Sequence, residues 1–274
     1  MQRYRGYIFD LDGTIYLGEQ AIPGAPETVR QLCEAGSRVT FISNKPLEPR
    51  ERYVEKLARL GIHTTTADVL TSGHVLGRWL AAESPGARVF VVGEPPLLAE
   101  LAAFELQVTN GAERSEEADF VVAAFDRTFD YHKLNIAFQA IRRGARFVAT
   151  NADRTCPVEG GEIPDAASVI GAIEGCTGQK VELVAGKPSP LIIEAGLARM
   201  GGLLPAQCLV VGDRLETDVV MAQRAGAASA LVLTGVTNRE ALDASPVQPD
   251  YVLDSVADLA NHQLLKTAIP MARW

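Results

Sequence analysis

The feature that most constrains the fold is a series of short apolar runs that recurs along the chain. Most runs are continuous rather than alternating between apolar and polar residues, which is typical of strands buried on both faces. Amphipathic segments with helical spacing lie between the runs, and several end at a glycine, a residue that commonly closes helices. This alternation of strand and helix predicts parallel sheets in an α/β architecture.

The pattern gives bounds for individual elements. The predicted strands are Tyr7–Leu11, Arg38–Ile42, Arg88–Val92, Phe120–Ala124, Arg146–Ala149, Cys208–Val211 and Ala228–Leu233. The predicted helices are Ala25–Ala35, Pro49–Leu60, Tyr131–Arg143, Pro190–Met200 and Glu216–Ala225.

The length and composition of the chain limit the classes of protein to which it can belong. A chain of 274 residues suggests two modest domains, because domains usually have ~100–200 residues. A net charge of −8 and a pI near 5.1 argue against a broad nucleic-acid surface, which would need a basic face. The four cysteines lack the spacing of a zinc site or a disulfide framework. With no signal peptide or membrane span in the pattern, we expect a cytoplasmic protein without a membrane partner.

Polar residues follow three of the apolar runs. They are Asp10-Leu11-Asp12-Gly13-Thr14, Ser43-Asn44 and Gly212-Asp213, and Lys187 adds a positive charge in a separate loop. In parallel sheets, ligands bind outside the carboxyl ends of the strands, so these positions predict a site. Residues 78–183 have strands and helices of their own but no such motif. We therefore expect an inserted domain at 78–183 and a core formed by 1–77 and 184–274.

Asp10 and Asp12 place two carboxylates two residues apart at a strand end, which is unusual unless a cation lies between them. Magnesium is the natural candidate, since it prefers oxygen ligands and usually takes only a few from protein. The alternative is that Asp-Gly-Thr makes a turn and the aspartates cap a helix. Asp213 disfavours that alternative, because it also ends an apolar run and has Asp218 one helical turn further on.

Lys187 lies in Gly186-Lys187-Pro188 and could be an ordinary exposed lysine. The same tripeptide also suggests a nucleotide-binding P-loop. That interpretation fails because Val181 occupies the position of the first glycine and Pro188 replaces the Ser or Thr that binds magnesium.

Taken in order, the DxDGT motif, the serine, the lysine and the GDxxxxD motif resemble the haloacid dehalogenase superfamily. Asp10–Gly18, Ala149–Asp153 and Gly186–Pro188 are further similar to its nitrophenyl, phosphoglycolate, pyridoxal phosphate and bacterial sugar-phosphate phosphatases. The resemblance covers nearly the whole chain. It implies a Rossmann-like core with an inserted α/β cap, here 78–183, that excludes bulk water from the site.

The resemblance also implies a reaction. Asp10 is the expected nucleophile, forming an aspartyl phosphate, and Asp12 the expected general acid and base. An aspartate at position 12 favours a phosphatase or a phosphomutase over a dehalogenase. The predicted activity is magnesium-dependent hydrolysis of a small phosphate monoester.

Further roles follow from the same resemblance. Ser43, Asn44 and Lys187 are expected to hold the phosphoryl oxygens. Asp10, Asp12 and Asp213 are expected to bind Mg²⁺. Asp218 is expected to orient Lys187 or a metal-bound water.

Substrate choice is expected to depend on the cap loop at residues 151–157. Arg154, Thr155 and Cys156 lie in it, and Cys156 stands where some vitamin-phosphate phosphatases have a histidine. Without the resemblance, Cys156 would read as a small buried apolar residue. Homodimers through the cap are common among similar proteins. Two other functions stay open, a phosphotransferase or phosphomutase and a non-catalytic phosphometabolite-binding protein.

Overall fold

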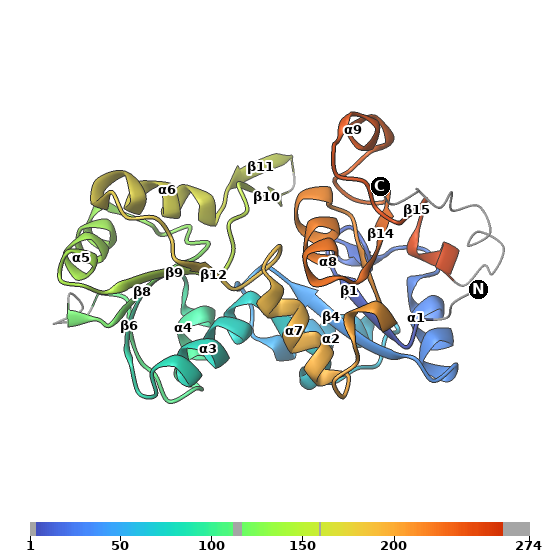
Figure 1. Cartoon of the computed structure of the whole chain (residues 1–274), viewed down its shortest axis with the longest axis horizontal. Coiled ribbons are helices and arrows are strands. Elements are labelled where there is room, and N and C mark those ends of the chain that lie inside the picture. Colours follow the sequence, from blue (N-terminus) through green and yellow to red (C-terminus); the bar gives the residue numbers. More distant parts are fainter. Residues whose placement is uncertain (1–3, 112–116, 159, 260–274) are drawn as a thin grey trace. The chain divides into compact units, whose positions relative to one another are not determined.

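The computed structural model describes residues 4–111, 117–158 and 160–259, and the chain divides into two compact units. Within the described residues, unit 1 comprises 4–43, 50–70 and 188–259, and unit 2 comprises 44–49 and 71–187. Each unit is built around its own sheet (Figure 1).

Unit 1 contains a six-stranded sheet in the order β15-β14-β13-β1-β4-β5. Its strands are β1 (Gly6–Asp10), β4 (Arg38–Ser43), β5 (Val69–Thr71, whose last residue belongs to unit 2), β13 (Cys208–Gly212), β14 (Ala228–Val232) and β15 (Tyr251–Leu253). The pairs β15–β14, β14–β13, β13–β1 and β1–β4 are all parallel. A small antiparallel hairpin, β2 (Tyr16–Leu17) and β3 (Gln20–Ala21), follows β1.

Helices cover both faces of this sheet. They are α1 (Ala25–Glu34), α2 (Arg50–Arg59), α7 (Pro190–Arg199), α8 (Val220–Ala225) and α9 (Arg239–Ala244), with 3₁₀ turns at Thr66–Asp68, Pro205–Gln207 and Val256–Leu259. Phe9 of β1 packs in one apolar cluster with Val29 of α1, whereas its neighbour Ile8 approaches Gly196 of α7. Because successive side chains of a strand point to opposite faces, both of them covered by helices, β1 is apolar up to its last residue, Asp10.

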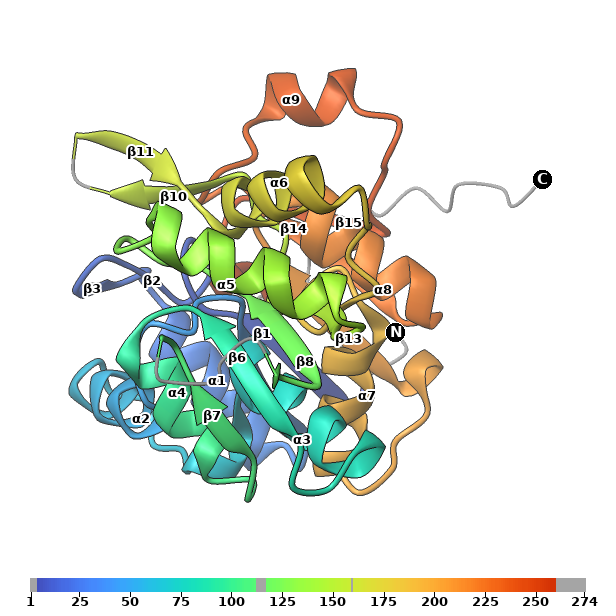
Figure 2. The same ribbon diagram turned by 90° about the vertical axis from the view of Figure 1, so that its left-hand side faces the viewer.

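Unit 2 contains a five-stranded parallel sheet in the order β12-β9-β8-β6-β7. Its strands are β6 (Arg88–Val92), β7 (Gln107–Thr109), β8 (Phe120–Ala123), β9 (Arg146–Ala149) and β12 (Leu183–Val184). Its helices are α3 (Ser72–Glu83), α4 (Pro95–Ala102), α5 (Tyr131–Arg142) and α6 (Ala166–Thr177). Helices α5 and α6 lie side by side against β8 (Figure 2).

The α/β fold class is confirmed. Each predicted strand and helix is present, with ends that differ by one or two residues for most of them. The prediction at Glu216–Ala225 needs correction, because this segment opens as a π-helical turn, Leu215–Val219, and only then continues as α8.

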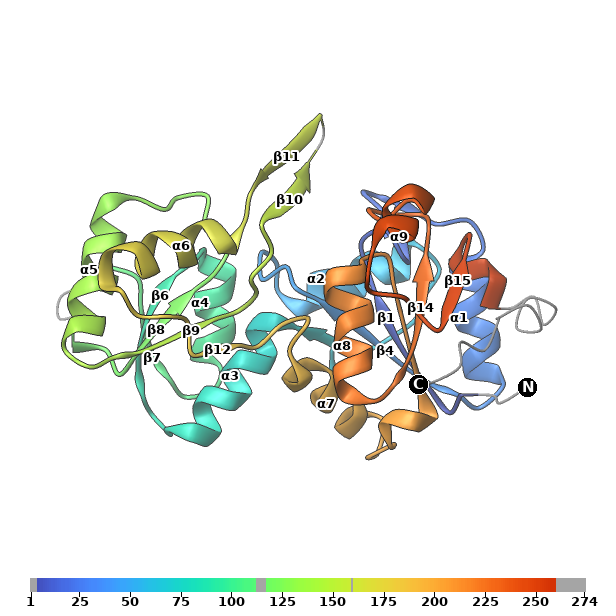
Figure 3. The same cartoon turned by 45° about the horizontal axis from the view of Figure 1, so that its top comes forward.

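The predicted loop at 151–157 is also wrong in part. Thr155 and Cys156 belong to a strand, β10 (Thr155–Val158), which pairs antiparallel with β11 (Gly161–Pro164). This hairpin projects from the rest of unit 2 (Figure 3). β-Branched residues at both ends of β10 and the glycines that precede and open β11 favour such a hairpin.

The predicted domain boundaries differ from the division into units. A boundary between residues 77 and 78 would cut helix α3, Ser72–Glu83, in two. The division lies instead between Leu70 and Thr71, before this helix, and the second one lies between Lys187 and Pro188. In addition, the short segment Asn44–Pro49 groups with unit 2.

A helix that crosses a bilayer must be both long and apolar. In residues 4–111, 117–158 and 160–259, no helix meets both requirements.

Candidate active site

Two predicted site aspartates lie at the carboxyl end of the unit 1 sheet. Asp10 is the last residue of β1, and Asp213 directly follows β13. These strands are parallel neighbours in a register that pairs Phe9 with Val211. The two aspartates therefore lie at the same edge of the sheet, where parallel α/β folds place their ligands.

Asp218 joins them to form a group of three carboxylates. One ligand oxygen from each of Asp10, Asp213 and Asp218 lies within 4.8 Å of the other two. Their exposed fractions are only 6%, 2% and 1%. Like charges this close and this deeply buried repel one another, so a cation between them would lower the free energy of the folded state.

The side chain of Asp213 is fixed by backbone on two sides. Its Oδ2 accepts a hydrogen bond of 2.7 Å from the Val236 amide. A Cβ at Gly235 would lie 2.0 Å from that oxygen, and a Cβ at Gly13 would lie 2.5 Å from it. Only glycine allows this approach at either position.

Asp218 is held by its own turn. Its Oδ2 accepts a hydrogen bond of 3.2 Å from the Arg214 amide, and its carboxyl carbon would lie 2.2 Å from a Cβ at Gly212. The π-helical turn Leu215–Val219 carries this side chain. Such turns are rare and often lie at functional sites.

The donor set fits a hard divalent cation. Carboxylate oxygens are the ligands that Mg²⁺ and Ca²⁺ prefer, and three of them from separate segments can surround an ion. Among the described residues, Asp12 is not part of this three-carboxylate group. Its side chain is partly exposed, and its backbone forms an isolated bridge with Tyr16. The assignment of Asp12 to the metal remains a prediction.

Ser43 lies at the adjacent strand end. It is the last residue of β4, it is 3% exposed, and the register pairs Asp10 with Ile42, its neighbour in the chain. The order β13-β1-β4 thus lines up Asp213, Asp10 and Ser43 at the ends of three neighbouring strands.

Asn44 and Lys187 belong to unit 2 and are bonded to each other. Asn44 Oδ1 accepts a hydrogen bond of 2.8 Å from the Lys187 amide, and Asn44 Nδ2 donates to the Lys187 carbonyl at 3.1 Å. Both residues are buried. Asn44 Nδ2 also donates to Asp153 Oδ2 at 2.8 Å.

Of the polar residues around this pair, Asn151 and Asp153 belong to the segment at 151–157 that the sequence singled out for substrate choice, whereas Asp165 was not predicted. Asn151 Nδ2 donates to Asp153 Oδ2 at 2.8 Å and to Asp165 Oδ1 at 3.1 Å. Asn151 and Asp153 follow β9, so unit 2 does have a polar strand end, and the expectation that 78–183 lacks one is wrong. The rule of polar strand ends also points to Thr234 after β14, in the segment where Gly235 and Val236 hold Asp213.

Asp165 carries a charge that burial disfavours. Burial raises the pKa of Asp165, while hydrogen bonds from the Ala166 amide and the Asn151 side chain act in the opposite direction. Its ionisation therefore opposes folding, and the stability that the protonated form provides is lost as the pH rises through the folded-state pKa.

Asp165→Asn is expected to unfold at a higher temperature than the wild type near neutral pH. The variant keeps an acceptor for the Ala166 amide but removes the buried charge, and a gain of ~1 kcal/mol corresponds to about 2–4 °C. The difference should shrink as the pH falls toward the ordinary aspartate pKa of 3.8. Thermal unfolding followed by circular dichroism across this range measures it, and a difference that widens on acidification contradicts this account.

Cys156, the predicted specificity residue, lies on β10 opposite Ile163 and is 5% exposed. This burial also agrees with the alternative interpretation, in which Cys156 is a small buried apolar residue without a role in substrate choice.

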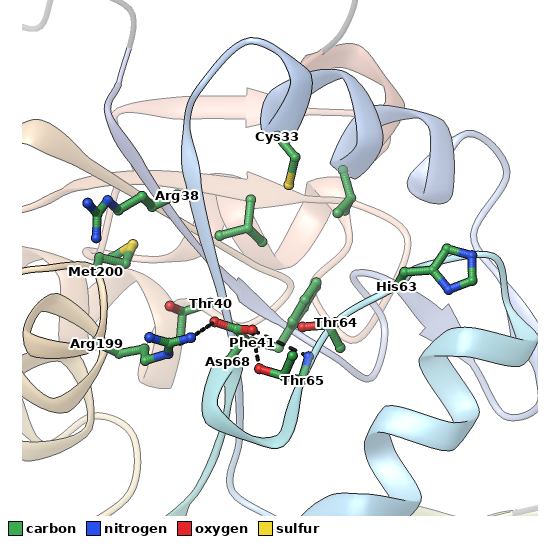
Figure 4. Close-up of a pocket in the computed structure, with 12 residues that line it drawn as sticks. Cys33, Arg38, Thr40, Phe41, His63, Thr64, Thr65, Asp68, Arg199 and Met200 are labelled. Atoms are coloured by element: carbon green, nitrogen blue, oxygen red, sulfur yellow. Dashed lines mark hydrogen bonds and ion pairs between the residues drawn. The ribbon is translucent and has the colours of Figure 1, made fainter.

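A cavity of about 380 Å³ lies elsewhere in unit 1. It contains no predicted site residue and is lined by Val29, Cys33, Arg38, Val39, Thr40, Phe41, His63, Thr64, Thr65, Asp68, Arg199 and Met200. Asp68 accepts a hydrogen bond from Thr65 and pairs with Arg199 at 3.0 Å (Figure 4). The lining charges of Asp68 and Arg199 thus largely balance each other.

Comparison with protein families matches both ends of the chain. A family described as haloacid dehalogenase-like hydrolase matches residues 7–107, and a second one, described as HAD-hydrolase-like, matches residues 184–259. The stretch between the two matches belongs to unit 2.

Individual relatives agree with the families. The chain is 40% identical to the sugar-phosphatase AraL of Bacillus subtilis, over 93% of this chain and 91% of the relative. It is 35% identical to the structure of a p-nitrophenyl phosphatase from Archaeoglobus fulgidus, with a TM-score of 0.89 over 95% of this chain and 99% of the other.

A third relative was solved with a metal. It is a glycerol phosphate phosphatase from Mycobacterium tuberculosis in complex with calcium, 36% identical, with a TM-score of 0.83 over 93% of this chain and 74% of the other. The phosphatases of this family generally use a divalent metal, which agrees with the three-carboxylate group. The solved relatives also confirm the core with an inserted cap domain. The chain therefore belongs to the haloacid dehalogenase-like hydrolase family, and within it to the phosphatases, which hydrolyse phosphate monoesters.

Proposed function

We propose that the protein is a Mg²⁺-dependent phosphatase that acts on a small soluble phosphate ester, with unit 1 as its catalytic core and unit 2 as its cap. The observation that carries the proposal is the group of three buried carboxylates of Asp10, Asp213 and Asp218 within 4.8 Å. Magnesium would be held by this group and would neutralise charge on the phosphate as it approaches.

Asp10 is the proposed nucleophile. Its carboxylate attacks phosphorus, and the ester oxygen leaves as the bond to the phosphoryl group breaks. Asp12 donates a proton to the departing oxygen and then removes one from the water that hydrolyses the aspartyl phosphate. That second step regenerates Asp10 and releases inorganic phosphate.

Ser43 and Lys187 are proposed to hold the phosphoryl oxygens. A hydroxyl and an ammonium group both donate hydrogen bonds, and the ammonium adds the positive charge that a site rich in aspartates needs for a dianionic ligand.

The proposed substrates are sugar phosphates and related polyol phosphates. The support is the similarity to a sugar-phosphatase and to a glycerol phosphate phosphatase. Phosphate release should be measured for nitrophenyl phosphate and several dozen metabolite esters, with Mg²⁺ and with a chelator. Metal-dependent release supports the proposal. If no ester releases phosphate, the protein is a non-catalytic phosphometabolite-binding protein. Transfer of labelled phosphate to a second metabolite would indicate a phosphotransferase or phosphomutase.

Lys187→Ala is expected to raise KM for nitrophenyl phosphate about 10–100-fold, because the site loses a fixed positive charge that attracts the phosphate. Lys180→Ala is a matched control, since Lys180 belongs to the same unit and its side chain is 84% exposed. Steady-state kinetics of both variants measure the effect. Equal kinetics for Lys187→Ala and the control would remove Lys187 from the phosphate site.

Alanine variants of Arg154, Thr155 and Cys156 are expected to change the preference among esters more than the chemistry. Each lost contact to a leaving group should raise the transition-state free energy for that ester, relative to the other esters, by about 1–3 kcal/mol, which lowers its relative kcat/KM. Nitrophenyl phosphate should be affected little. The test is to measure kcat/KM for a panel of esters with the wild type and the three variants. If a variant slows the hydrolysis of all esters by the same factor, these residues support cap closure rather than substrate recognition.

A further inference from the structure

The chain passes between the two units at four points, and polar residues stand beside three of them. The crossings lie at residues 43/44, 49/50, 70/71 and 187/188. On the unit 2 side, Asn44 lies directly after the crossing at 43/44 and Lys187 directly before the crossing at 187/188. Ser72 is the second residue after the crossing at 70/71.

Asn44 links these three positions. Its side-chain amide exchanges hydrogen bonds with the backbone of Lys187, accepting from the amide at 2.8 Å and donating to the carbonyl at 3.1 Å. Its own carbonyl accepts a hydrogen bond of 2.8 Å from Ser72 Oγ. One asparagine thus joins segments that are 28 and 143 residues away in the sequence.

Both hydrogens of the Asn44 side-chain amide are used by hydrogen bonds within unit 2. Nδ2 carries two hydrogens, and it donates to the Lys187 carbonyl and to Asp153 Oδ2 at 2.8 Å. An Asn44 that held phosphate through Nδ2 would have to give up one of these bonds. Because the group is buried, the acceptor left behind would be costly.

The surroundings leave the amide little freedom to turn. A Cβ at Gly186 would lie 2.4 Å from Asn44 Oδ1, 2.7 Å from the Thr150 carbonyl and 2.9 Å from Ser72 Cβ. Only a glycine before Lys187 allows this approach. Asn151 fixes the other end by donating to Asp153 Oδ2 at 2.8 Å.

We propose that Asn44 is a positioning residue whose side chain holds the backbone of Lys187 and thereby directs its ammonium group, and that this side-chain amide does not itself bind the phosphate. This inference rests on the proposed role of Lys187 in the proposed function. It differs from the expectation, drawn from sequence, that Asn44 holds the phosphoryl oxygens, because it assigns the side-chain amide to Lys187 instead.

A pair of exchanged substitutions tests the proposal. Asn44→Asp keeps the acceptor for the Lys187 amide but sets a carboxylate against Asp153, and it removes the donor to the Lys187 carbonyl. Asp153→Asn alone leaves an amide oxygen as acceptor and should have a small effect. In the double variant, Asn44→Asp with Asp153→Asn, the new amide can donate to the new carboxylate, so the bond between positions 44 and 153 is restored with its direction reversed. The Lys187 amide keeps its acceptor, the Lys187 carbonyl still lacks its donor, and Asn151 can still donate to Asp165.

The main readout is the dissociation constant of inorganic phosphate in the presence of Mg²⁺, measured by calorimetry, which needs no turnover. Asn44→Asp should raise it about 10–100-fold, and the double variant should bind phosphate about 5-fold more tightly than this single variant, a partial recovery because the Lys187 carbonyl still lacks its donor. The Mg²⁺ dependence should stay unchanged, because the carboxylate group belongs to unit 1. Asn135→Asp is the matched control, since Asn135 is an exposed residue of α5.

Direct phosphate binding by Asn44 predicts a different result. A carboxylate at position 44 would repel phosphate in the single and the double variant alike, so the absence of recovery overturns the proposal. Should Asn44→Asp fail to fold, Ser72→Ala is used in its place. It removes only the bond to the Asn44 carbonyl and should raise the phosphate constant about 2–5-fold, and an unchanged constant would contradict the proposal.

The two proposals fail in different ways. A wild type that releases no phosphate from any ester contradicts the proposed function, whatever the variants do in calorimetry. An active wild type whose double variant shows no recovery contradicts only the positioning role of Asn44.

Discussion

Asp10→Asn is expected to lower kcat for phosphate esters by at least about 10³-fold while the protein stays folded. The substitution keeps the shape of the side chain but replaces the attacking oxygen's negative charge with a neutral amide. It also relieves part of the repulsion within the group formed with Asp213 and Asp218. The melting temperature should therefore be equal to that of the wild type or higher.

The measurement is steady-state hydrolysis of nitrophenyl phosphate beside thermal unfolding. Asp68→Asn is a suitable control, because Asp68 belongs to the same unit but lies in the separate cavity, where it pairs with Arg199. It should lose some stability and keep its kcat. Near-wild-type turnover in Asp10→Asn would exclude Asp10 as the nucleophile.

Asp213→Asn is expected to raise the Mg²⁺ concentration needed for half-maximal activity about 100-fold, since a neutral amide is a poor ligand for a hard divalent cation. The environment of Asp213 decides how the amide will lie. The Val236 amide needs an acceptor at the position of Oδ2, so the amide oxygen should take that position. The NH₂ group would then take the position of Oδ1, away from the Val236 amide, and an NH₂ group cannot bind a cation.

A titration of activity with Mg²⁺ measures this effect, and at saturating metal much of the activity should return. Thermal unfolding with and without Mg²⁺ gives a second readout that does not depend on turnover. The wild type should be stabilised by the metal and the variant less so, because a ligand that binds only the folded state stabilises it. Equal metal dependence in both proteins would remove Asp213 from the metal site.

The strands and the positions of the aspartates could be predicted because each depends on a local signal. β1 is covered by helices on both faces, so its sequence is continuously apolar, and the chain turns polar at Asp10 where the strand ends. Gly36 and Gly226 follow helices in left-handed conformations, with φ of 83° and 74°, which is what a closing glycine provides.

Asp218 was expected at the site only to orient Lys187 or a metal-bound water, and its place in one group with Asp10 and Asp213 could not be predicted in the same way. The sequence pattern predicted a regular helix over Glu216–Ala225, whereas the structure has a π-helical turn, Leu215–Val219, which adds a residue to the turn that carries Asp218. Nothing in the composition of that segment distinguishes it from an ordinary helix start.

The predicted division of the chain differs from the observed one at both boundaries. The first, after residue 77, lies later than the division between Leu70 and Thr71, and the second, after residue 183, lies earlier than the division between Lys187 and Pro188. Gly73 and Gly77 lower the helix propensity of Ser72–Glu83, so this helix gave no clear pattern and the predicted boundary fell inside it. The contacts of Asn44 were beyond prediction, because its partner Lys187 is 143 residues away in the sequence.

The central claim is that Asp10 carries the phosphoryl group during turnover, and chemical trapping tests it most directly. Enzyme quenched during hydrolysis of nitrophenyl phosphate is treated with tritiated borohydride, which reduces an acyl phosphate to an alcohol, and the labelled peptide is then mapped. The account predicts label at position 10 in the wild type with substrate, and none without substrate or in Asp10→Asn. Active enzyme that gives no label, or label at any other residue, would contradict it.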